Sequence, residues 1–592
     1  MQILGLRDLH GLASLAEISA VWWIGIFLLA AGGLFVFYQV RKQFARKRQL
    51  AGLRARWGGF QARDRDLETL REFHQVCPPL WAGAAAMIDD HTWNDLHMNN
   101  VFAQVERAFT TPGDCILYRV LRHPLDSPAN LERRNDLIQL FQNNAEVREK
   151  LQAGLLPIGR ENARGLISLI WTDTPPPRDS VWLYYILTAL AAGALAATLL
   201  SRGGPFILLV LICFFVNMTV HYRVRTSLMG RLAALRQLGA LIHGAGIISR
   251  LDRPELVEYS QSLRGLSGST QRIAGKVALL LPEGSATGDL VSMLLEYLSI
   301  YFLHEVRIFH SVIVDIIAKK GELKSIFCRI GELDTWQSVA SFRAGSRAFT
   351  LPKFIAEGSD LEICDAIHPL LPVPVPNSIE IRGKGIAITG SNMSGKTTFL
   401  RTIGVNVLLA QTVNTVLAAS YRGRMLQIIT SMNEADSLLE GKSYYLAEAE
   451  RLLTMVRQSE GSAKVLCLID EPLAGTNSPE RLAASREILR YLVEHNGLAM
   501  VCTHDVELVA RLQDRGEFEA YHFADQADDQ GIRFDYRLKV GLDYHGNAIR
   551  VLKYLGYPEA IINRAFDDLR EAGQAAAPPP FPPANSAAPP IN

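Results

Sequence analysis

Long apolar runs are the first feature of the chain. Residues Ile18 to Tyr38 are almost uninterruptedly apolar, close to the length of about 20 residues that a bilayer-spanning helix needs. A cluster of basic residues follows directly: Arg41, Lys42, Arg46, Lys47 and Arg48. A cleaved signal peptide carries its basic residues before the apolar run instead. The order found here predicts a retained membrane anchor over about residues 18–38, with its C-terminal flank in the cytoplasm.

A second pair of apolar runs covers Val181 to Leu200 and Phe206 to Val220, with a short turn over residues 201–205 between them. Arginines flank the pair on both sides, at Arg178, Arg223 and Arg225. This arrangement predicts a hairpin that enters the membrane from the cytoplasm and returns to it. The alternative is a pair of buried core helices. With the first run, we expect a multi-pass membrane protein with three spans, which in a prokaryote would lie in the inner membrane.

In the remaining chain, the spacing of apolar positions changes at about residue 360. Residues 50–175 and 226–345 have apolar positions at three- and four-residue intervals, which predicts helices. Beyond residue 360, short apolar runs alternate with glycine-containing loops and helical stretches. Three of these runs are typical of buried parallel strands: Gly385–Thr389, Val465–Ile469 and Leu498–Cys502. The Ala- and Pro-rich residues 573–592 predict a disordered tail.

Composition narrows the classes of function. The 592 residues carry 61 Lys and Arg against 60 Asp and Glu, a net charge of +1, which argues against a polybasic nucleic-acid coat but leaves a local basic surface open. An apolar fraction of 48% excludes a mainly disordered chain. The 7 cysteines are scattered, odd in number and never spaced as CxxC, so neither a disulfide framework nor a zinc site is expected. This pattern fits a reducing compartment.

One motif carries clear chemistry. Residues 390–397 read Gly-Ser-Asn-Met-Ser-Gly-Lys-Thr and match the phosphate-loop pattern GxxxxGK[ST], after a predicted strand and before a predicted helix. Glycines in such a loop let backbone N–H groups converge on phosphate oxygens. Lys396 is expected to reach the β- and γ-phosphates of ATP, and the Thr397 hydroxyl to ligate Mg²⁺. The alternative, a chance glycine-rich turn, is disfavoured by the flanking strand and helix.

An acidic pair, Asp470-Glu471, ends the second predicted strand. Because the carboxyl ends of parallel strands meet at one edge of a sheet, we expect this pair beside the phosphate loop. Asp470 is placed to hold Mg²⁺ together with Thr397, and Glu471 to polarise the attacking water as the catalytic base. The third strand ends in Thr503-His504, which puts His504 where it can sense the γ-phosphate. Away from such an edge, an acidic pair or a lone histidine is usually part of a solvated loop.

A third segment, Asp436 to Ser443, lies between these motifs and contains Gly441-Lys442-Ser443 before a predicted helix. A Gly-x-Ser sequence at a helix start can present a hydroxyl and N–H groups to a phosphate, and it is equally typical of a helix N-cap. His304-Glu305 resembles the start of a metalloprotease motif, but Ile308 stands where the second histidine is needed. We therefore exclude a protease.

Together these motifs resemble the MutS family of DNA mismatch-repair ATPases. The resemblance rests on residues 389–398, where Asn392-Met393 is characteristic, on residues 436–443, on residues 468–477 and on Thr503-His504. Supporting similarities lie at residues 544–565, 111–113, 122–125, 131–134 and 332–334. The resemblance is specific over about residues 360–570, and moderate over about residues 90–175 and 300–360.

The resemblance implies a homodimer in which each ATP site is completed by the partner's signature loop. Gly441 and Ser443 would then contact the γ-phosphate bound in the opposite subunit. ATP would close a clamp, and hydrolysis would reopen it. With this loop included, the residues expected to bind the nucleotide are Gly390, Ser391, Asn392, Met393, Ser394, Gly395, Lys396, Thr397, Thr398, Asp470, Gly441 and Ser443.

The expected architecture is multi-domain α plus α/β: a helical core and lever region with transmembrane helices, followed by a P-loop, ABC-type α/β ATPase domain. The segments are residues 1–49, the anchor and its basic flank; 50–179, a helical region that is MutS core-like from about residue 90; 180–222, the transmembrane hairpin; 223–359, a lever-like helical region; 360–570, the MutS-type ATPase domain; and 571–592, the tail. This arrangement leaves the ATPase domain in the cytoplasm.

The sequence also departs from the family's pattern. The family's mismatch-reading domain has no counterpart here, and the hairpin leaves too little chain between His123 and Asp334 for both levers and a full DNA clamp. The segment Pro372–Asn377 lacks the aromatic residue on which relatives often stack adenine. We therefore expect ATP binding to be retained, and mismatch recognition to be reduced or absent.

Two functions stay open. The first is a membrane-anchored ATPase that binds mismatched or branched DNA through an ATP-switched dimeric clamp and serves DNA repair. Six arginines of the lever-like helices would meet DNA phosphates, although a solvated helix face explains each of them equally well: Arg231, Arg236, Arg250, Arg253, Arg264 and Arg272. The second is an ATP-driven membrane machine that acts on a protein or membrane partner without DNA. An ABC transporter fits poorly, because three spans offer only a thin pathway.

Overall fold

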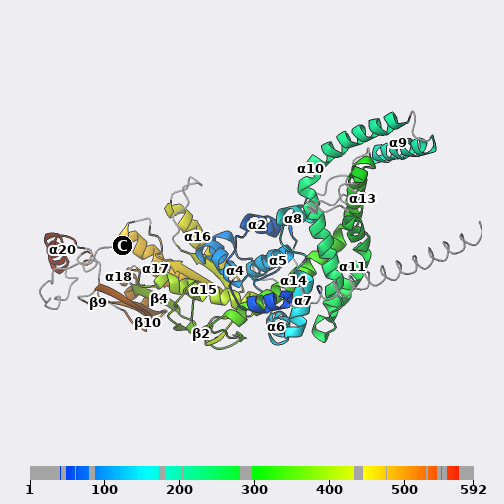
Figure 1. The fold of residues 1–592 in the computed structure, drawn as a ribbon. Helices are drawn as coiled ribbons and strands as arrows, with labels where there is room; N and C mark the ends of the chain where they lie inside the picture. The colour runs from blue at the N-terminus through cyan, green and yellow to red at the C-terminus, as the bar shows by residue number, and fades with distance from the viewer. Residues whose placement is uncertain are drawn as a thin grey trace, which may run out of the picture. The chain divides into compact units, whose positions relative to one another are not determined.

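The computed structural model describes residues 41, 48–60, 62–78, 87–172, 181–201, 206–279, 297–391, 393–432, 444–474, 477–528, 531–542, 549, 552 and 556–571. The chain forms two compact units, and each is assembled from separate stretches of sequence (Figure 1). The first unit contains residues 1–63, 107–113 and 139–345, and the second contains residues 64–106, 114–138 and 346–592. The first predicted membrane span, residues 18–38, and the predicted tail from residue 573 lie outside the described residues.

The described residues of the first unit form helices. They are α7 (Ala145–Leu155), α8 (Ala163–Trp171), α9 (Val181–Leu200), α10 (Ile207–Ile248), the 3₁₀ turn η1 (Pro254–Leu256), α11 (Val257–Ala278), α13 (His304–Ala318) and α14 (Lys320–Gly345). The 42 residues of α10 form one continuous helix, about 63 Å long at 1.5 Å per residue. Its second half packs against α11 and α8, because Leu235, Leu238 and Ile242 recur at helical spacing and are fully buried.

A buried carboxylate joins the short segment 107–113 to α14. Asp334 accepts hydrogen bonds from the N–H of Phe109 at 3.0 Å, the N–H of Thr110 at 2.8 Å and the Thr110 hydroxyl at 2.6 Å. Gln337 donates to the other oxygen of the same carboxylate at 2.9 Å. A fully buried charge is tolerated only when its hydrogen bonds are made, and here they are.

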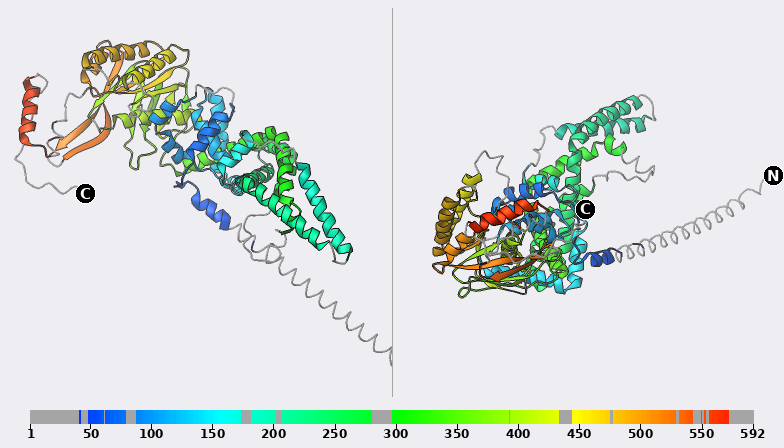
Figure 2. Two further views of the ribbon diagram at one scale, coloured as in Figure 1. Left: turned by 90° about the horizontal axis from the view of Figure 1, so that it is seen from above. Right: turned by 90° about the vertical axis from the view of Figure 1, so that its left-hand side faces the viewer.

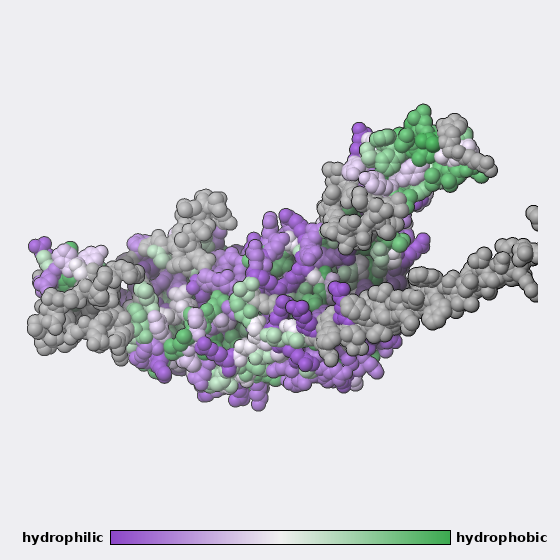
Figure 3. Space-filling model, viewed as in Figure 1, coloured by the Kyte–Doolittle hydropathy of each residue, from purple (hydrophilic) through white to green (hydrophobic). Residues whose placement is uncertain are grey.

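The predicted hairpin appears as α9 and the first part of α10, which lie side by side with apolar surfaces exposed (Figure 3). Leu190, Leu199 and Leu208 are all exposed. Among the described residues, α9 is the one helix long and apolar enough to cross a membrane, while Ile207–Arg223 is a shorter apolar stretch. The structure thus describes one candidate span where the sequence predicts three, so the expectation of several transmembrane helices is unsupported.

The second unit is built on a six-stranded sheet in the order β10-β9-β4-β8-β7-β6. Its strands are β4 (Gly385–Gly390), β6 (Gln427–Ser431), β7 (Val465–Asp470), β8 (Gly497–Cys502), β9 (Phe518–Asp528) and β10 (Gly531–Val540). All neighbours are parallel except β10, which is antiparallel to β9. The three strands predicted from apolar runs are therefore present as β4, β7 and β8. A smaller sheet has the order β1-β5-β2-β3, from β1 (Lys353–Phe354), β2 (Leu361–Ala366), β3 (Asn377–Ile381) and β5 (Ser420–Gly423).

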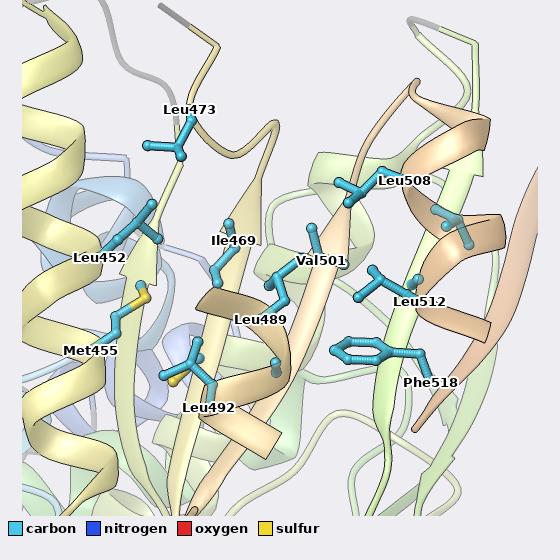
Figure 4. Close-up of a cluster of buried hydrophobic side chains, with 14 of the residues drawn as sticks. Leu452, Met455, Ile469, Leu473, Leu489, Leu492, Val501, Leu508, Leu512 and Phe518 are labelled. Carbon is cyan, nitrogen blue, oxygen red and sulfur yellow. The ribbon is translucent and has the colours of Figure 1, made fainter. Parts of the chain in front are cut away.

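Helices cover both faces of the larger sheet, and Figure 2 shows them from two further directions. They are α15 (Lys396–Val413), α16 (Tyr444–Ser459), α17 (Ser478–Glu494) and α18 (Val506–Gln513). A further helix, α20 (Glu559–Glu571), lies near the end of the chain. Side chains alternate along a strand, so Val465, Cys467 and Ile469 of β7 share one face. They pack in a core with residues of α16, α17 and α18 (Figure 4). Leu468 faces the opposite way, toward Gly404 of α15, where a Cβ atom would lie 2.7 Å from the Leu468 side chain.

Helices from the first part of the chain complete this unit. They are α2 (Leu67–Val76), α3 (Asp90–Asp95) and α4 (Met98–Val105), together with parts of α5 (Thr111–Arg122) and α6 (Pro128–Asn143). Buried polar contacts tie α3 to the sheet: Asp95 accepts from the Thr430 hydroxyl at 2.6 Å and from the N–H of Met432 at 3.0 Å. Arg451 of α16 donates to both carboxylate oxygens of Asp89. The chain as a whole is a mixed α/β protein, mostly helical, as the sequence predicts.

Candidate nucleotide-binding site

The phosphate loop joins β4 to α15, as its motif predicts. The chain turns out of β4 at Gly390, whose φ is +144°, and enters the helix after Gly395, whose φ is +103°. A Cβ atom on Gly390 would lie 2.8 Å from the carbonyl oxygen of Phe523, so this position requires glycine. Met393 is 83% exposed with φ +73°. Asn392, which the sequence also assigns to the nucleotide, lies outside the described residues.

Lys396 occupies the centre of the loop. Its Nζ donates to the carbonyl oxygens of Gly390 at 2.7 Å and Ser391 at 3.0 Å, and the side chain is buried. The hydroxyl oxygens of Ser391 and Ser394 are also buried, and neither has a hydrogen-bond partner among the residues that the structure describes. Buried hydroxyls rarely lack partners, so this pair fits a loop whose hydroxyls donate hydrogen bonds to phosphate oxygens. The N-terminus of α15 adds its positive dipole end.

Thr397 and Asp470 meet beside this loop. The Thr397 hydroxyl donates to the Asp470 carboxylate at 2.5 Å, and Asp470 is the last residue of β7. Burial raises the pKa of Asp470, and the neighbouring Glu471 raises it further, whereas Thr397 and Lys396 act in the opposite direction. No cluster of three His, Cys, Asp or Glu side chains in the described part of the chain could hold a metal by itself. A hydroxyl and one carboxylate suit Mg²⁺, which takes its remaining ligands from phosphates and water.

Glu471 and His504 are brought together at the same sheet edge. Glu471 has φ +50°, and its N–H donates to the carbonyl oxygen of Cys502 at 2.8 Å. Its carboxylate accepts from the N–H of His504 at 3.0 Å and from the Thr503 hydroxyl at 3.0 Å. The Nδ1 atom of His504 lies 2.8 Å from the same carboxylate. The ends of β7 and β8 therefore fix the orientation of Glu471, and His504 contacts this carboxylate.

A pocket of ≈ 580 Å³ opens in front of the loop, a volume typical of sites for nucleotide-sized ligands. Its polar end is formed by Ser391, Lys396, Thr397, Thr398, Asp470 and Glu471. Its other walls include Leu371, Val373, Val375 and the ring of Tyr536. Gly441 and Ser443, expected from the opposite subunit, lie outside the described residues.

Tyr536 is one of the pocket residues that the sequence does not predict. It belongs to β10, at a register shift between Phe534 and Leu538 in the pairing with β9. Asn377 fixes this bend, because its side chain donates to the Tyr536 carbonyl at 2.9 Å and accepts from the N–H of Leu538 at 2.7 Å. Tyr536 thus supplies an aromatic ring to a pocket whose segment Pro372–Asn377 has none. No motif surrounds it, so the sequence offers no signal for its place.

A phosphate loop between β4 and α15, with a carboxylate and a second acidic residue at the carboxyl ends of neighbouring parallel strands, is the arrangement typical of P-loop nucleotide-binding proteins. Residues 386–572 match the family model of MutS domain V. Relatives are the DNA mismatch repair protein MSH3 of Phaeosphaeria nodorum (28% identity over 43% of this chain and 24% of that protein) and the DNA mismatch repair protein MutS of Persephonella marina (29% over 41% and 28%). Another is Endonuclease MutS2 of Thermus thermophilus (31% over 41% and 32%).

These matches confirm the resemblance to the MutS family: residues 386–572 match MutS domain V, and they include the phosphate loop, Asp470 and Glu471 of the candidate site. The alignments span about a quarter to a third of the length of these curated relatives.

Proposed function

We propose that the chain is an ATPase of the MutS type. The observation that carries the proposal is the convergence of Lys396, the Thr397–Asp470 pair and Glu471 on one pocket. When ATP binds, the Nζ of Lys396 would give up its hydrogen bonds to the carbonyls of Gly390 and Ser391 and would contact the β- and γ-phosphates instead. Thr397 and Asp470 would hold Mg²⁺, which neutralises charge on the phosphates.

Glu471 is the proposed general base. Its carboxylate is held by Thr503 and His504 and lies at the pocket wall, where it would accept the proton of the attacking water. In Glu471→Gln we expect ATP binding to persist while hydrolysis falls on the order of 10²- to 10⁴-fold, the usual contribution of a general base. Lys396→Ala should instead lose ATP binding. Equilibrium binding and steady-state phosphate release distinguish the two defects, and normal turnover in Glu471→Gln would exclude it as the base.

The partner that we propose for this ATPase is DNA, held by an ATP-switched homodimer. The relatives' names, which refer to DNA mismatch repair, support this proposal, as does the signature segment 436–443. In the first unit, Arg250 and Arg253, which follow α10, are exposed, as is Arg272 on α11, which lies 4.0 Å from Asp315. Ser443→Ala should weaken ATP-driven dimerisation, which sedimentation would measure, and undiminished dimerisation would contradict the role of Ser443.

The test for DNA is ATP hydrolysis by purified protein without DNA and with matched, mismatched and branched duplexes at fixed salt. A rate that changes with DNA supports the clamp, and the ranking of the duplexes would identify the preferred structure. A rate indifferent to every DNA favours the second candidate, an ATP-driven machine whose partner is a protein or the membrane. The exposed apolar surface of α9 is the observation that keeps this second candidate open.

We also propose that α9 and the apolar start of α10 insert into a membrane, with the ATPase domain in the cytoplasm. Only 17% of the most apolar 18-residue stretch of α9 is buried, whereas a core helix of similar composition would be mostly buried. Trp182, Tyr185 and Tyr222 are exposed at the end of the hairpin opposite its turn, a position typical of aromatic residues at a membrane interface. An environment-sensitive dye on Leu199→Cys should shift to shorter wavelength with vesicles, and one on Gln261→Cys of α11 should not. Equal spectra at both positions would exclude insertion.

A further inference from the structure

Glu448 connects the helix that follows the signature segment to the loop that carries Glu471. It lies in the second turn of α16, which begins at Tyr444, directly after residues 436–443. Its side chain is 8% exposed. The Oε1 atom accepts the N–H of Leu473 at 2.5 Å. Burial raises the pKa of Glu448, and the N–H groups of Leu473 and Ala474 lower it, as expected for a carboxylate that both of them face.

The loop that Glu448 holds has an unusual backbone. Glu471 and Leu473 both have left-handed conformations, with φ of +50° and +56°. Non-glycine residues adopt this region only when their surroundings enforce it. Left-handed residues that alternate with residues of negative φ turn neighbouring N–H groups to one side and form a concave anion site. The anion here is the Glu448 carboxylate, which comes from another helix.

Packing joins the same two elements. Leu473 is buried in the core of the second unit, together with Leu452 and Met455 of α16 (Figure 4). Other elements also hold the described part of the loop: the hydroxyl of Ser485 donates to the carbonyl of Pro472 at 3.3 Å, and the end of β8 holds Glu471. The contacts of α16 with this loop are therefore the Glu448 carboxylate and the packing of Leu473 against the helix.

We infer that Glu448 is a positioning residue that couples the signature segment to the general base. The inference rests on the proposed function, because it assigns a regulator to the same ATP site. When the partner's nucleotide engages residues 436–443, α16 shifts and Glu448 draws the loop with it, which places the carboxylate of Glu471 for catalysis. Glu448 does not contact the nucleotide pocket, so ATP binding does not depend on it.

The experiment compares single-site variants of the full chain. Glu448→Ala removes the acceptor, and Glu448→Asp retracts it by one methylene. Displacement of a catalytic group by about 1 Å can lower the rate 10²-fold, so we expect kcat to fall 10- to 100-fold in both, with the Kd for ATP unchanged within threefold. Glu448→Gln keeps an oxygen at the same reach and should recover most of the rate. Glu450→Ala, at an exposed position of the same helix, is the matched control and should resemble wild type.

A second measurement tests the coupling. The wild-type rate per subunit should rise with protein concentration as dimers form, and this rise should be lost in Glu448→Asp at an unchanged dimer fraction. Wild-type kcat in Glu448→Asp would overturn the inference, as would loss of ATP affinity in parallel with kcat. The Asp and Gln variants decide the matter even if Glu448→Ala does not fold. A wild-type protein without ATPase activity would instead refute the proposed function itself.

Discussion

His368 makes the stability of the second unit depend on pH. It follows β2 on the wall of the nucleotide pocket and is 6% exposed. Its Nδ1 accepts the N–H of Leu370 at 3.3 Å, which requires a neutral ring. Burial, with repulsion from Arg401 and His97, lowers the pKa of His368 to about 4. In the unfolded chain the ring has its ordinary pKa of about 6.5.

The sign and size of the effect follow from these two values. Between pH 6.5 and 4 the unfolded state binds the proton and the folded state does not, so the unfolded state gains stability as the pH falls. The titration of His368 therefore leaves the unfolding free energy unchanged above pH 6.5 and lowers it increasingly as the pH falls toward 4. Relative to pH 8, the loss is about 2 kcal/mol at pH 5 and approaches about 3 kcal/mol at pH 4, at 1.36 kcal/mol per pKa unit.

His368→Asn isolates this contribution, because its side-chain oxygen can accept the same N–H and does not titrate. Other groups titrate equally in both proteins, so we expect the wild type to lose about 2 kcal/mol more than the variant between pH 8 and pH 5. Hydrogen exchange of the β4 amides reports the second unit alone, which avoids treating two units as one transition. Parallel pH dependence in the two proteins, or a His368 pKa above 6 by NMR, would refute the reasoning.

Substitutions at three further positions test the site and the second unit. Gly390→Ala should lose ATP binding and about 2 kcal/mol or more of stability, because the new Cβ meets the carbonyl of Phe523; a calorimetric titration that shows wild-type affinity would contradict this. Tyr536→Ala should weaken ATP binding roughly tenfold if the ring stacks on the base, while Tyr536→Phe should not, and equal affinities in both would exclude stacking. Arg451→Ala leaves Asp89 without its bidentate partner and should lower the unfolding free energy by about 2 kcal/mol; an unchanged urea midpoint would contradict it.

The parts of the site that the sequence predicts are those encoded by contiguous residues. The phosphate loop, Asp470-Glu471 and Thr503-His504 each follow an apolar run that forms a buried parallel strand. Parallel strands place their carboxyl ends together, so three separate motifs are enough to predict one site. The structure brings them together at the edge of β4, β8 and β7 as expected.

The assembly of the second unit could not be read in the same way. Its first residues, 64–106 and 114–138, join a sheet that begins more than two hundred positions later. The joining contacts are single hydrogen bonds from ordinary polar residues, such as Arg134 to the carbonyl of Thr412 at 2.6 Å. An arginine on a predicted helix has the same local pattern whether it is solvated or buried. Helical periodicity therefore predicts domains made of consecutive residues, and it cannot predict that residues 64–106 and 114–138 join a later sheet.

Tyr536 and Glu448 show why such residues escape pattern reading even when they complete a site. Tyr536 reaches the pocket because β10 pairs with β9 through a register shift, and a one-residue change in register would turn its ring to the other face of the sheet. Glu448 acts through two backbone N–H groups whose direction depends on left-handed conformations at Glu471 and Leu473. Neither residue type favours that conformation. The role of Tyr536 therefore depends on strand pairing, and that of Glu448 on backbone conformation. Substitution at either position tests the observed geometry together with the proposed chemistry.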